Sequence, residues 1–434
     1  MATSDGLRPT SLESAMHPET SESISFPTAA ASDATGGTYV PTEPLGRLFL
    51  RFLRFGCLAW GGPIAQIGMV RHSLVDEQKW VSSEHFNRVL ALYQILPGPE
   101  AHELCVYFGM LSRGRIGGVL AGVGFMLPGF VLMFALSWLY VRFGLDTSGA
   151  LGLVFASIQA AVGALIVRAL HRIGRHALED AWLWVIGIVG LLAQVAGVHF
   201  ALILATGGLL YLLAQRQPAG AGAALAIAVV ALIAWFVHNG SGLQGTVTAG
   251  DFPVGERTAP GAVPLFLSGL KAGLLTFGGA YTAIPLLQHE AVARGAWMTN
   301  AQFLDGLALS GLLPAPLIIF STFVGYIGGG PAGALLMTAG TFLPAFAFTL
   351  VAHEPLERLV HHPRARTFLK GLMAAVVGLI AGTAVSLLLV SIVSAVTAAI
   401  FLLALGALFY WHSKLLVPLM IAAAAGIGWL ASFL

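Results

Sequence analysis

Charged residues are scarce in this chain of 434 residues. Asp, Glu, Lys and Arg together make up 10% of it, whereas soluble domains carry about 25%. The mean hydropathy is +0.84 and 57% of the residues are hydrophobic, which excludes an ordinary soluble domain and predicts a polytopic membrane protein. A formal net charge of +2 is too small to indicate nucleic-acid binding. The partner that composition predicts is therefore the lipid bilayer.

Cysteine is nearly absent, and so are the common cofactor motifs. Only Cys57 and Cys105 occur, both in apolar segments, so we expect neither a disulfide nor a thiolate metal cluster. His102 and Glu103 are not followed by a second histidine at the spacing of HExxH, and no GxxxxGK[ST] loop for ATP is present. We expect no metal, no cofactor and no enzyme activity.

The N-terminal 44 residues contain a single basic residue and no apolar run of spanning length. Arg8 is the only Lys or Arg before residue 45, which argues against a secretory signal peptide and predicts a disordered tail. The domain organisation expected is a tail at 1–44, a first repeat at 45–217, a linker with one membrane segment and an outer loop at 218–260, and a second repeat at 261–434.

Long hydrophobic runs fill the rest of the chain. Apolar windows of spanning length fall at 46–70, 85–111, 116–141, 149–170, 182–197, 199–215, 222–238, 263–287, 303–328, 333–352, 368–391, 395–411 and 415–433. With the N-terminus cytoplasmic, 16 of the 22 Lys and Arg residues lie on the cytoplasmic side, as the positive-inside rule requires. We expect an all-α protein with about 13 membrane segments, some of them re-entrant, and a periplasmic C-terminus.

The two halves of the chain resemble each other at an offset of 217 residues. Positions 53–99 and 270–316 share 16 identities in 47 positions without a gap. An odd number of segments, seven, separates equivalent helices, so the second copy is expected to be inverted in the bilayer. Inverted repeats are common in secondary transporters, whose substrate sites lie where matched helices are interrupted.

Such interruptions occur twice in each half. Proline removes a backbone donor and glycine admits left-handed geometry, and the half-helix after a break presents free N–H groups to an anion. Taken singly, each break could be a simple kink, but the matched set predicts a small oxyanion site. The break residues are Gly61, Gly62, Pro63, Pro97, Gly98, Pro99, Gly278, Gly279, Pro314 and Pro316.

Ionisable groups stand close to these breaks. Arg54 and its repeat mate Lys271 are hypothesised to attract the anion, although snorkelling at the interface is an equal alternative. Glu100, His102 and Glu103 follow the first Pro-Gly-Pro directly. An ionisable group at membrane depth is a functional hypothesis by default, so these three are predicted to couple protons. The alternative is that they cap a half-helix N-terminus.

Four motifs together resemble the chromate ion transporter (CHR) family in its long-chain, two-domain form. They are WGGPIAQIGMV (60–70), LALYQILPGPEAHEL (90–104), TFGGAYTAIPLL (276–287) and LSGLLPAPLIIF (309–320). The resemblance extends over both halves. It implies that the break residues and Glu100 are family motif positions, and it adds two further motif positions, Gln66 and Gln94. Many members have Pro-Gly-Pro in the second half, where this chain has Ala315 in place of the glycine.

The resemblance implies an inner-membrane transporter that exports chromate, is driven by the proton-motive force and confers chromate resistance, with sulfate as a competing oxyanion. Energetics favour export, because a dianion crossing the membrane gains or loses about 4.6 kcal/mol per 100 mV. Left open are a sulfate or other oxyanion importer on the same scaffold, an intramembrane enzyme using Glu100 and His102, a passive channel, and assembly into a homo-oligomer.

Overall fold

The structure is a computed structural model that describes residues 40–94, 96–143, 150–239, 260–276, 280–352, 362–411, 413 and 415–433. Within these residues the regular structure is helical throughout, as expected. Five helical stretches are long and apolar enough to cross a membrane, namely Glu100–Arg142, Gly152–Ala177, Pro218–Phe236, Leu317–Leu350 and Pro363–Ser391. Several shorter apolar helices accompany them. Most of the expected tail and of the outer loop lies outside the described residues.

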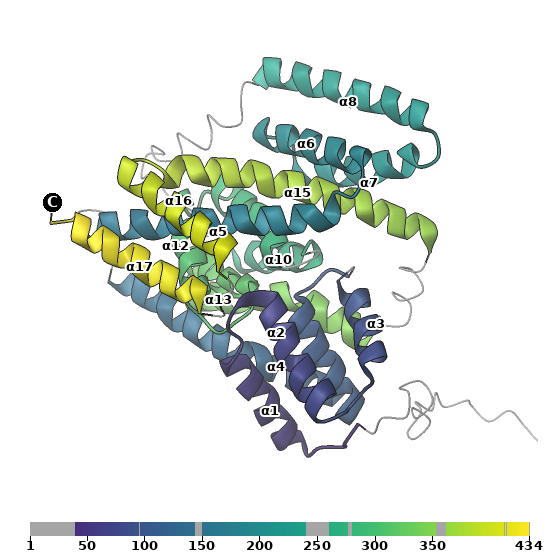
Figure 1. The fold of residues 1–434 in the computed structure, drawn as a ribbon, viewed down its shortest axis with the longest axis vertical. Coiled ribbons are helices and arrows are strands. Elements are labelled where there is room, and N and C mark those ends of the chain that lie inside the picture. Colours follow the sequence, from purple (N-terminus) through teal and green to yellow (C-terminus); the bar gives the residue numbers. More distant parts are fainter. Residues whose placement is uncertain are drawn as a thin grey trace, which may run out of the picture.

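The first half opens with short helices that are followed by one long helix (Figure 1). The short elements are α1 (Leu45–Cys57), α2 (Gly62–Arg71), the π-helical turn η1 (His72–Glu77) and α3 (Ser83–Tyr93), and the long helix is α4 (Glu100–Arg142). The glycine and proline motifs lie between these helices. At 1.5 Å per residue α1 is about 20 Å long and α2 about 15 Å, whereas the hydrocarbon core is ~30 Å thick. The interruptions expected in windows 46–70 and 85–111 are present.

Helix α4 is a hairpin of two arms, 100–112 and 115–142. The turn is made at Gly114, whose φ is 60°, a conformation that glycine adopts without steric cost. The arms lie so close that a Cβ at Gly109 would collide with the carbonyl group of Gly117. Small residues allow such backbone contact between membrane helices. The loop expected between windows 85–111 and 116–141 is the tip of this hairpin.

The second half repeats this arrangement. Its elements are α10 (Ala262–Leu274), the 3₁₀ turn η3 (Ala280–Thr282), α11 (Ala283–Gln288), the π-helical turn η4 (His289–Arg294), α12 (Asn300–Gly311), the 3₁₀ turn η5 (Leu317–Phe320) and α13 (Ser321–Leu350). Helix α13 turns back at Gly330, whose φ is also 60°. A Cβ at Gly325 would collide with the carbonyl of Gly333, and Thr322 and Thr338 share a hydrogen bond of 2.8 Å across the arms.

The hairpins of the two halves pack against each other in opposite directions. The side chain of Leu350 contacts Gly118, and that of Phe346 contacts Gly122. The residue number thus falls along α13 as it rises along α4, so the second arms of these helices run antiparallel. Phe134 of α4 packs edge-on against Tyr326 of α13, with ring centroids 5.4 Å apart.

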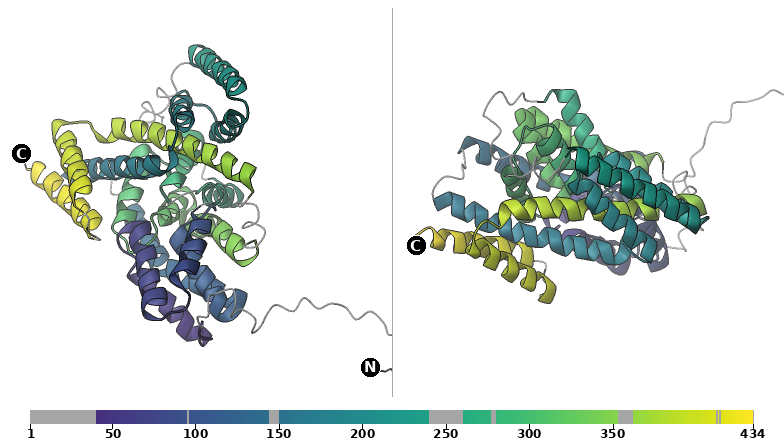
Figure 2. Two further views of the ribbon diagram at one scale, coloured as in Figure 1. Left: turned by 45° about the vertical axis from the view of Figure 1, so that its right-hand side comes forward. Right: turned by 90° about the horizontal axis from the view of Figure 1, so that it is seen from above.

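The remaining helices cross over between the halves (Figures 1 and 2). Helices α6 and α7 of the first half pack on α15 of the second, and α16 and α17 of the second half pack on α5 of the first. Helix α8 packs on α7 at the periphery. The bounds are α5 (Ala150–Ala177), α6 (Ala181–Val195), α7 (Phe200–Ala214), α8 (Pro218–Asn239), α15 (Pro363–Ser391), α16 (Ala395–Tyr410) and α17 (Leu416–Ala431).

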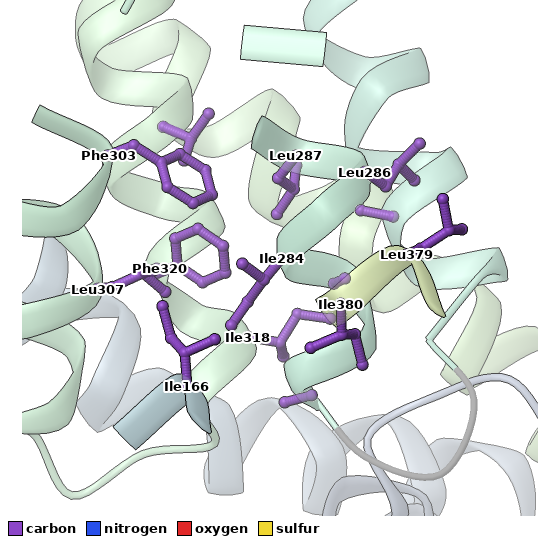
Figure 3. Close-up of a cluster of buried hydrophobic side chains, with 14 of the residues drawn as sticks. Ile166, Ile284, Leu286, Leu287, Phe303, Leu307, Ile318, Phe320, Leu379 and Ile380 are labelled. Atoms are coloured by element: carbon purple, nitrogen blue, oxygen red, sulfur yellow. The ribbon is translucent and has the colours of Figure 1, made fainter. Parts of the chain in front are cut away.

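A buried hydrophobic cluster holds the centre together (Figure 3). Ile284 and Leu287 of α11 lie against Phe320 of η5 and Phe303 of α12, and the two phenylalanine rings meet edge-on at 5.4 Å. Ile380 of α15 belongs to the same cluster. This core fixes the short helices on either side of the second-half breaks.

Candidate functional site

A small cavity lies where a break of one half meets a break of the other. Its volume is about 90 Å³, enough for several water molecules and far below the ~300–1,000 Å³ of organic-ligand pockets. The first half contributes Trp60, Gly61, Gly62 and Pro63, and the second half contributes Leu313, Ala315 and Leu317 around its Pro-x-Pro. The cavity therefore matches the scale of a small ion rather than that of an organic substrate.

The first-half wall of the cavity is the N-terminus of α2. Gly61 and Gly62 have φ of 89° and 76°, and Pro63 stands in the first turn, where its missing N–H costs no hydrogen bond. Gln66, one turn further on, donates from Nε2 to the carbonyl oxygen of Ala59 at 2.9 Å, which closes the break. The glycine pair thus directs a helix N-terminus, with its partial positive charge, toward the cavity.

The first-half Pro-Gly-Pro bonds to the described chain just before the second-half Gly-Gly. The backbone N–H of Gly98, within the first Pro-Gly-Pro, donates to the carbonyl oxygen of Thr276 at 2.7 Å. Thr276 is the last described residue before the second-half Gly-Gly; Gly278 and Gly279 themselves lie outside the described residues. Thr276, at the end of the described chain before the second-half Gly-Gly, therefore lies beside the second break of the first half.

Glu100, His102 and Glu103 are buried at the start of α4. Their exposed fractions are 8%, 0% and 0%. The Glu103 carboxylate packs directly on Gly98, where a Cβ would lie 2.5 Å from Oε1. Within the described part of the chain neither carboxylate oxygen of Glu103 has a hydrogen-bond partner. The acids beside this break are thus held inside the protein and away from bulk water.

His102 has an aromatic environment. Its ring lies 5.0 Å from that of Phe342 and 4.8 Å from that of Phe346, both on α13, and 6.5 Å from Phe125 on α4. Among the described residues neither ring nitrogen meets hydrogen-bond criteria with a partner. The histidine therefore fills the contact between the two hairpins.

Arg172 of α5 is the cation at the cavity. It is half-buried, lines the cavity together with Tyr281, and its guanidinium carbon lies 5.6 Å from the Tyr281 ring centroid. Among the described residues it forms no ion pair within 4.0 Å, although it interacts electrostatically with Glu100. Sequence reasoning missed this residue, because Arg172 was one of the 16 basic residues assigned to the cytoplasmic side, together with Arg168 and Arg175 of the same helix.

The two basic residues that the sequence singled out lie elsewhere. Lys271 pairs with buried Glu290 at 3.1 Å, and Ser268 donates to the other carboxylate oxygen at 3.0 Å. Arg54 is exposed on α1. Neither lines the cavity, so the structure offers no contact through which they would bind an ion there.

The remaining motif residues serve the breaks themselves. Pro99 precedes the first turn of α4, and Pro316 precedes η5. Pro314 is buried, Pro97 is half-buried, and Gln94 is exposed at the end of α3. Gln94 does not line the cavity, and Pro99 and Pro316 stand directly before the helices that follow them.

These features define a class: a polytopic helical membrane protein with paired helix breaks around a small, positively lined cavity. The chain belongs to the chromate transporter family, whose model matches residues 46–212 and 263–429. The two matched stretches start 217 residues apart (263 − 46), which is the offset of the internal repeat. The protein is accordingly a transporter and not an enzyme.

Relatives of two lengths match the chain. A chromate transport protein of Pseudomonas aeruginosa is 53% identical over 414 residues, covering 94% of this chain and 97% of that protein. A chromate transport protein of Cupriavidus metallidurans is 32% identical, covering 93% and 96%. The uncharacterized transporter YwrB of Bacillus subtilis is 28% identical over 159 residues, covering 36% of this chain and 78% of its own. No solved structure matches.

Proposed function

We propose that the protein is a secondary transporter that exports chromate across the inner membrane and is driven by the proton-motive force. The observation that carries the proposal is the cavity, where a helix N-terminus and Arg172 converge without a carboxylate within ion-pair distance among the described residues. A half-buried cation with no carboxylate within ion-pair distance favours an anionic ligand. The names of the relatives from Pseudomonas and Cupriavidus support chromate as that ligand.

The roles of the motif residues follow from their positions. Gly61 and Gly62 present backbone N–H groups to the oxyanion and Pro63 starts the helix behind them, while Leu313, Ala315 and Leu317 form the opposite wall. Pro97, Gly98 and Pro99 hold Glu100 and Glu103 beside the other pair of breaks. Arg172 lines the cavity and supplies a positive charge for the oxyanion there. Glu100, His102 and Glu103 are the proposed proton-coupling groups.

The proposed topology is two inverted repeats with the N-terminus cytoplasmic and the C-terminus periplasmic, and with the repeats at 45–217 and 261–434 joined by a linker. The antiparallel second arms of α4 and α13 support the inversion. The hairpin tips differ in charge: the first carries Arg113 and Arg115, whereas the second reads Gly329-Gly330-Pro331. By the positive-inside rule the first tip is cytoplasmic and the second periplasmic.

Transport by everted membrane vesicles tests the function. Energised everted vesicles that contain the protein are expected to accumulate labelled chromate, and a protonophore is expected to abolish the accumulation. Accumulation only in right-side-out vesicles would defeat export. Unchanged transport after addition of a protonophore, with the anion gradient intact, would indicate a passive channel.

Sulfate is the competing substrate, because it shares the charge and shape of chromate. Growth separates the two alternatives: an exporter confers chromate resistance on its host, whereas a sulfate importer makes the host more sensitive to chromate when sulfate is scarce. Sensitised growth would replace the proposed function with oxyanion import on the same scaffold.

A further inference from the structure

The structure contains a buried acid that the proposed mechanism does not use. Asp305 lies in the middle of α12 with an exposed fraction of 1%. Its Oδ2 accepts a hydrogen bond from the Tyr140 hydroxyl at 2.8 Å, and its Oδ1 accepts one from Nε2 of Gln159 at 2.9 Å. Tyr140 and Gln159 belong to α4 and α5 of the first half. Asp305 therefore joins the two halves of the protein.

Asp305 differs from the other buried acids that have partners. Glu43 pairs with Arg51, and Glu290 pairs with Lys271, so each of these carboxylates is compensated by a cation. Among the described residues Asp305 forms no ion pair, and the groups that face it from α4 and α5 are the neutral hydroxyl and amide. No charged group of α13, α15 or α17 in the described part of the chain interacts with it.

The position of Asp305 links it to the cavity. Leu307 and Ser310, on the same helix α12, line the cavity. Asp305 also lies far from the first-half acids along α4: His102 contacts Phe125, and Tyr140 is fifteen residues further on, which is about 22 Å at 1.5 Å per residue. The buried acids are thus separated along α4: Glu100 and Glu103 lie at its start, and Asp305 lies near Tyr140 at its far end. Asp305 is on the helix that lines the cavity.

We propose that Asp305 is a second proton-binding site of the transport cycle, a role that rests on the proposed function. The ionised carboxylate accepts both hydrogen bonds. When one oxygen takes up a proton, it gains an O–H donor, so the Tyr140 hydroxyl oxygen or the amide oxygen of Gln159 turns to accept from it and the connection between the halves changes. The proton is bound and released on the same carboxylate, and α12, which carries Asp305 and also lines the cavity, transmits the change toward the substrate.

Asp305→Asn tests this role in proteoliposomes with two readouts. The asparagine is neutral and keeps the size and both polar atoms of the site. Net chromate transport driven by an imposed proton gradient is expected to fall by about 5- to 150-fold, the usual range of coupling between two sites. Chromate–chromate exchange without a gradient, which needs no net proton movement, is expected to persist. Asp305→Glu, which keeps a titratable group, is expected to restore part of the driven transport.

Asp180→Asn is the matched control. Asp180 also accepts a hydrogen bond from a tyrosine, Tyr211, at 2.7 Å, but it is a half-buried N-cap at the start of α6. Both readouts are expected to stay at the wild-type level in this variant. Gradient-driven transport at the wild-type level in Asp305→Asn would overturn the inference. Loss of exchange together with a lower melting temperature would also overturn it, because that result indicates a structural role. Absence of chromate transport by the wild type would instead overturn the proposed function.

Discussion

At the scale of single residues, the account depends on one cation. Arg172 lines the cavity, whereas Arg175, one turn further along α5, is exposed. Charge-assisted hydrogen bonds contribute about 1.5–3 kcal/mol, so Arg172→Ala is expected to lower chromate transport by about tenfold or more. Arg172→Lys keeps the charge without the planar fork and is expected to be intermediate. Initial rates in everted vesicles measure the effect, with Arg175→Ala as the control that stays at the wild-type level.

Gly98 tests the contact between the first Pro-Gly-Pro and the buried acids. A methyl group at this position would meet the Glu103 carboxylate at 2.5 Å, and overpacking of this kind costs about 1–3 kcal/mol. Gly98→Ala is expected to lower the melting temperature of the purified protein and to slow transport. Gly68→Ala is the control, because a Cβ there meets nothing within 4 Å. Equal melting temperatures for the two variants would contradict the close contact between Gly98 and the Glu103 carboxylate.

Lys271 and Arg54 are repeat mates with different expected roles. Lys271→Ala leaves the buried carboxylate of Glu290 without its closest cation, which costs about 1–3 kcal/mol of stability. Arg54→Ala removes an exposed side chain and is expected to change neither stability nor transport. Thermal unfolding and vesicle transport of both variants measure this. A transport defect in Arg54→Ala at normal stability would restore the anion-attracting role that the sequence suggested.

Sequence alone predicts the break residues but not their partners. Gly61, Gly62 and Pro97 are recognisable because glycine and proline act locally on the backbone. The hydrogen bond from Gly98 to Thr276 joins segments of different halves, and no local pattern encodes it. Arg172 was missed for the same reason: its neighbours Trp60 and Tyr281 are distant in the chain, and its spacing from Arg168 and Arg175 is typical of a helix end at the cytoplasmic surface.

At the scale of elements, the helical hairpins are the repeated unit. Hydropathy predicted a turn between windows 85–111 and 116–141, and the tip at Gly114 lies there. What hydropathy could not predict is that α3 packs back on the first arm of α4. His85 bonds to the Tyr107 hydroxyl at 2.7 Å, and Phe86 stacks on Phe108 at 6.1 Å. These contacts depend on tertiary packing and leave no periodic trace in an apolar segment.

The hairpin tip makes its own prediction. Gly114→Ala forces an L-residue into φ of 60°, which costs about 1–2 kcal/mol, and Gly330→Ala in the second half is expected to cost the same. A Cβ meets nothing within 4 Å at either tip, so the loss is conformational and not steric. Thermal unfolding of both variants measures it, with Gly222→Ala in α8, also in open space, as the control. Unequal losses at the two tips would contradict the structural equivalence of the hairpins.

At the scale of the whole molecule, the two halves form one transport unit. Helices α6 and α7 pack on α15, and α16 and α17 pack on α5, so neither half completes its own packing. The first break of the first half likewise meets the second break of the second half, and Gly98 bonds to Thr276 of the other half. Half-length relatives such as YwrB are expected to need a second subunit for the same reason.

Equilibrium binding of labelled chromate to the purified protein tests the central claim most directly: that an oxyanion binds between the helix breaks at Arg172. Saturable binding is expected for the wild type, a loss of affinity of about tenfold or more for Arg172→Ala, and unchanged affinity for Arg54→Ala and Arg175→Ala. Wild-type affinity in a correctly folded Arg172→Ala protein would place the substrate elsewhere and contradict the account.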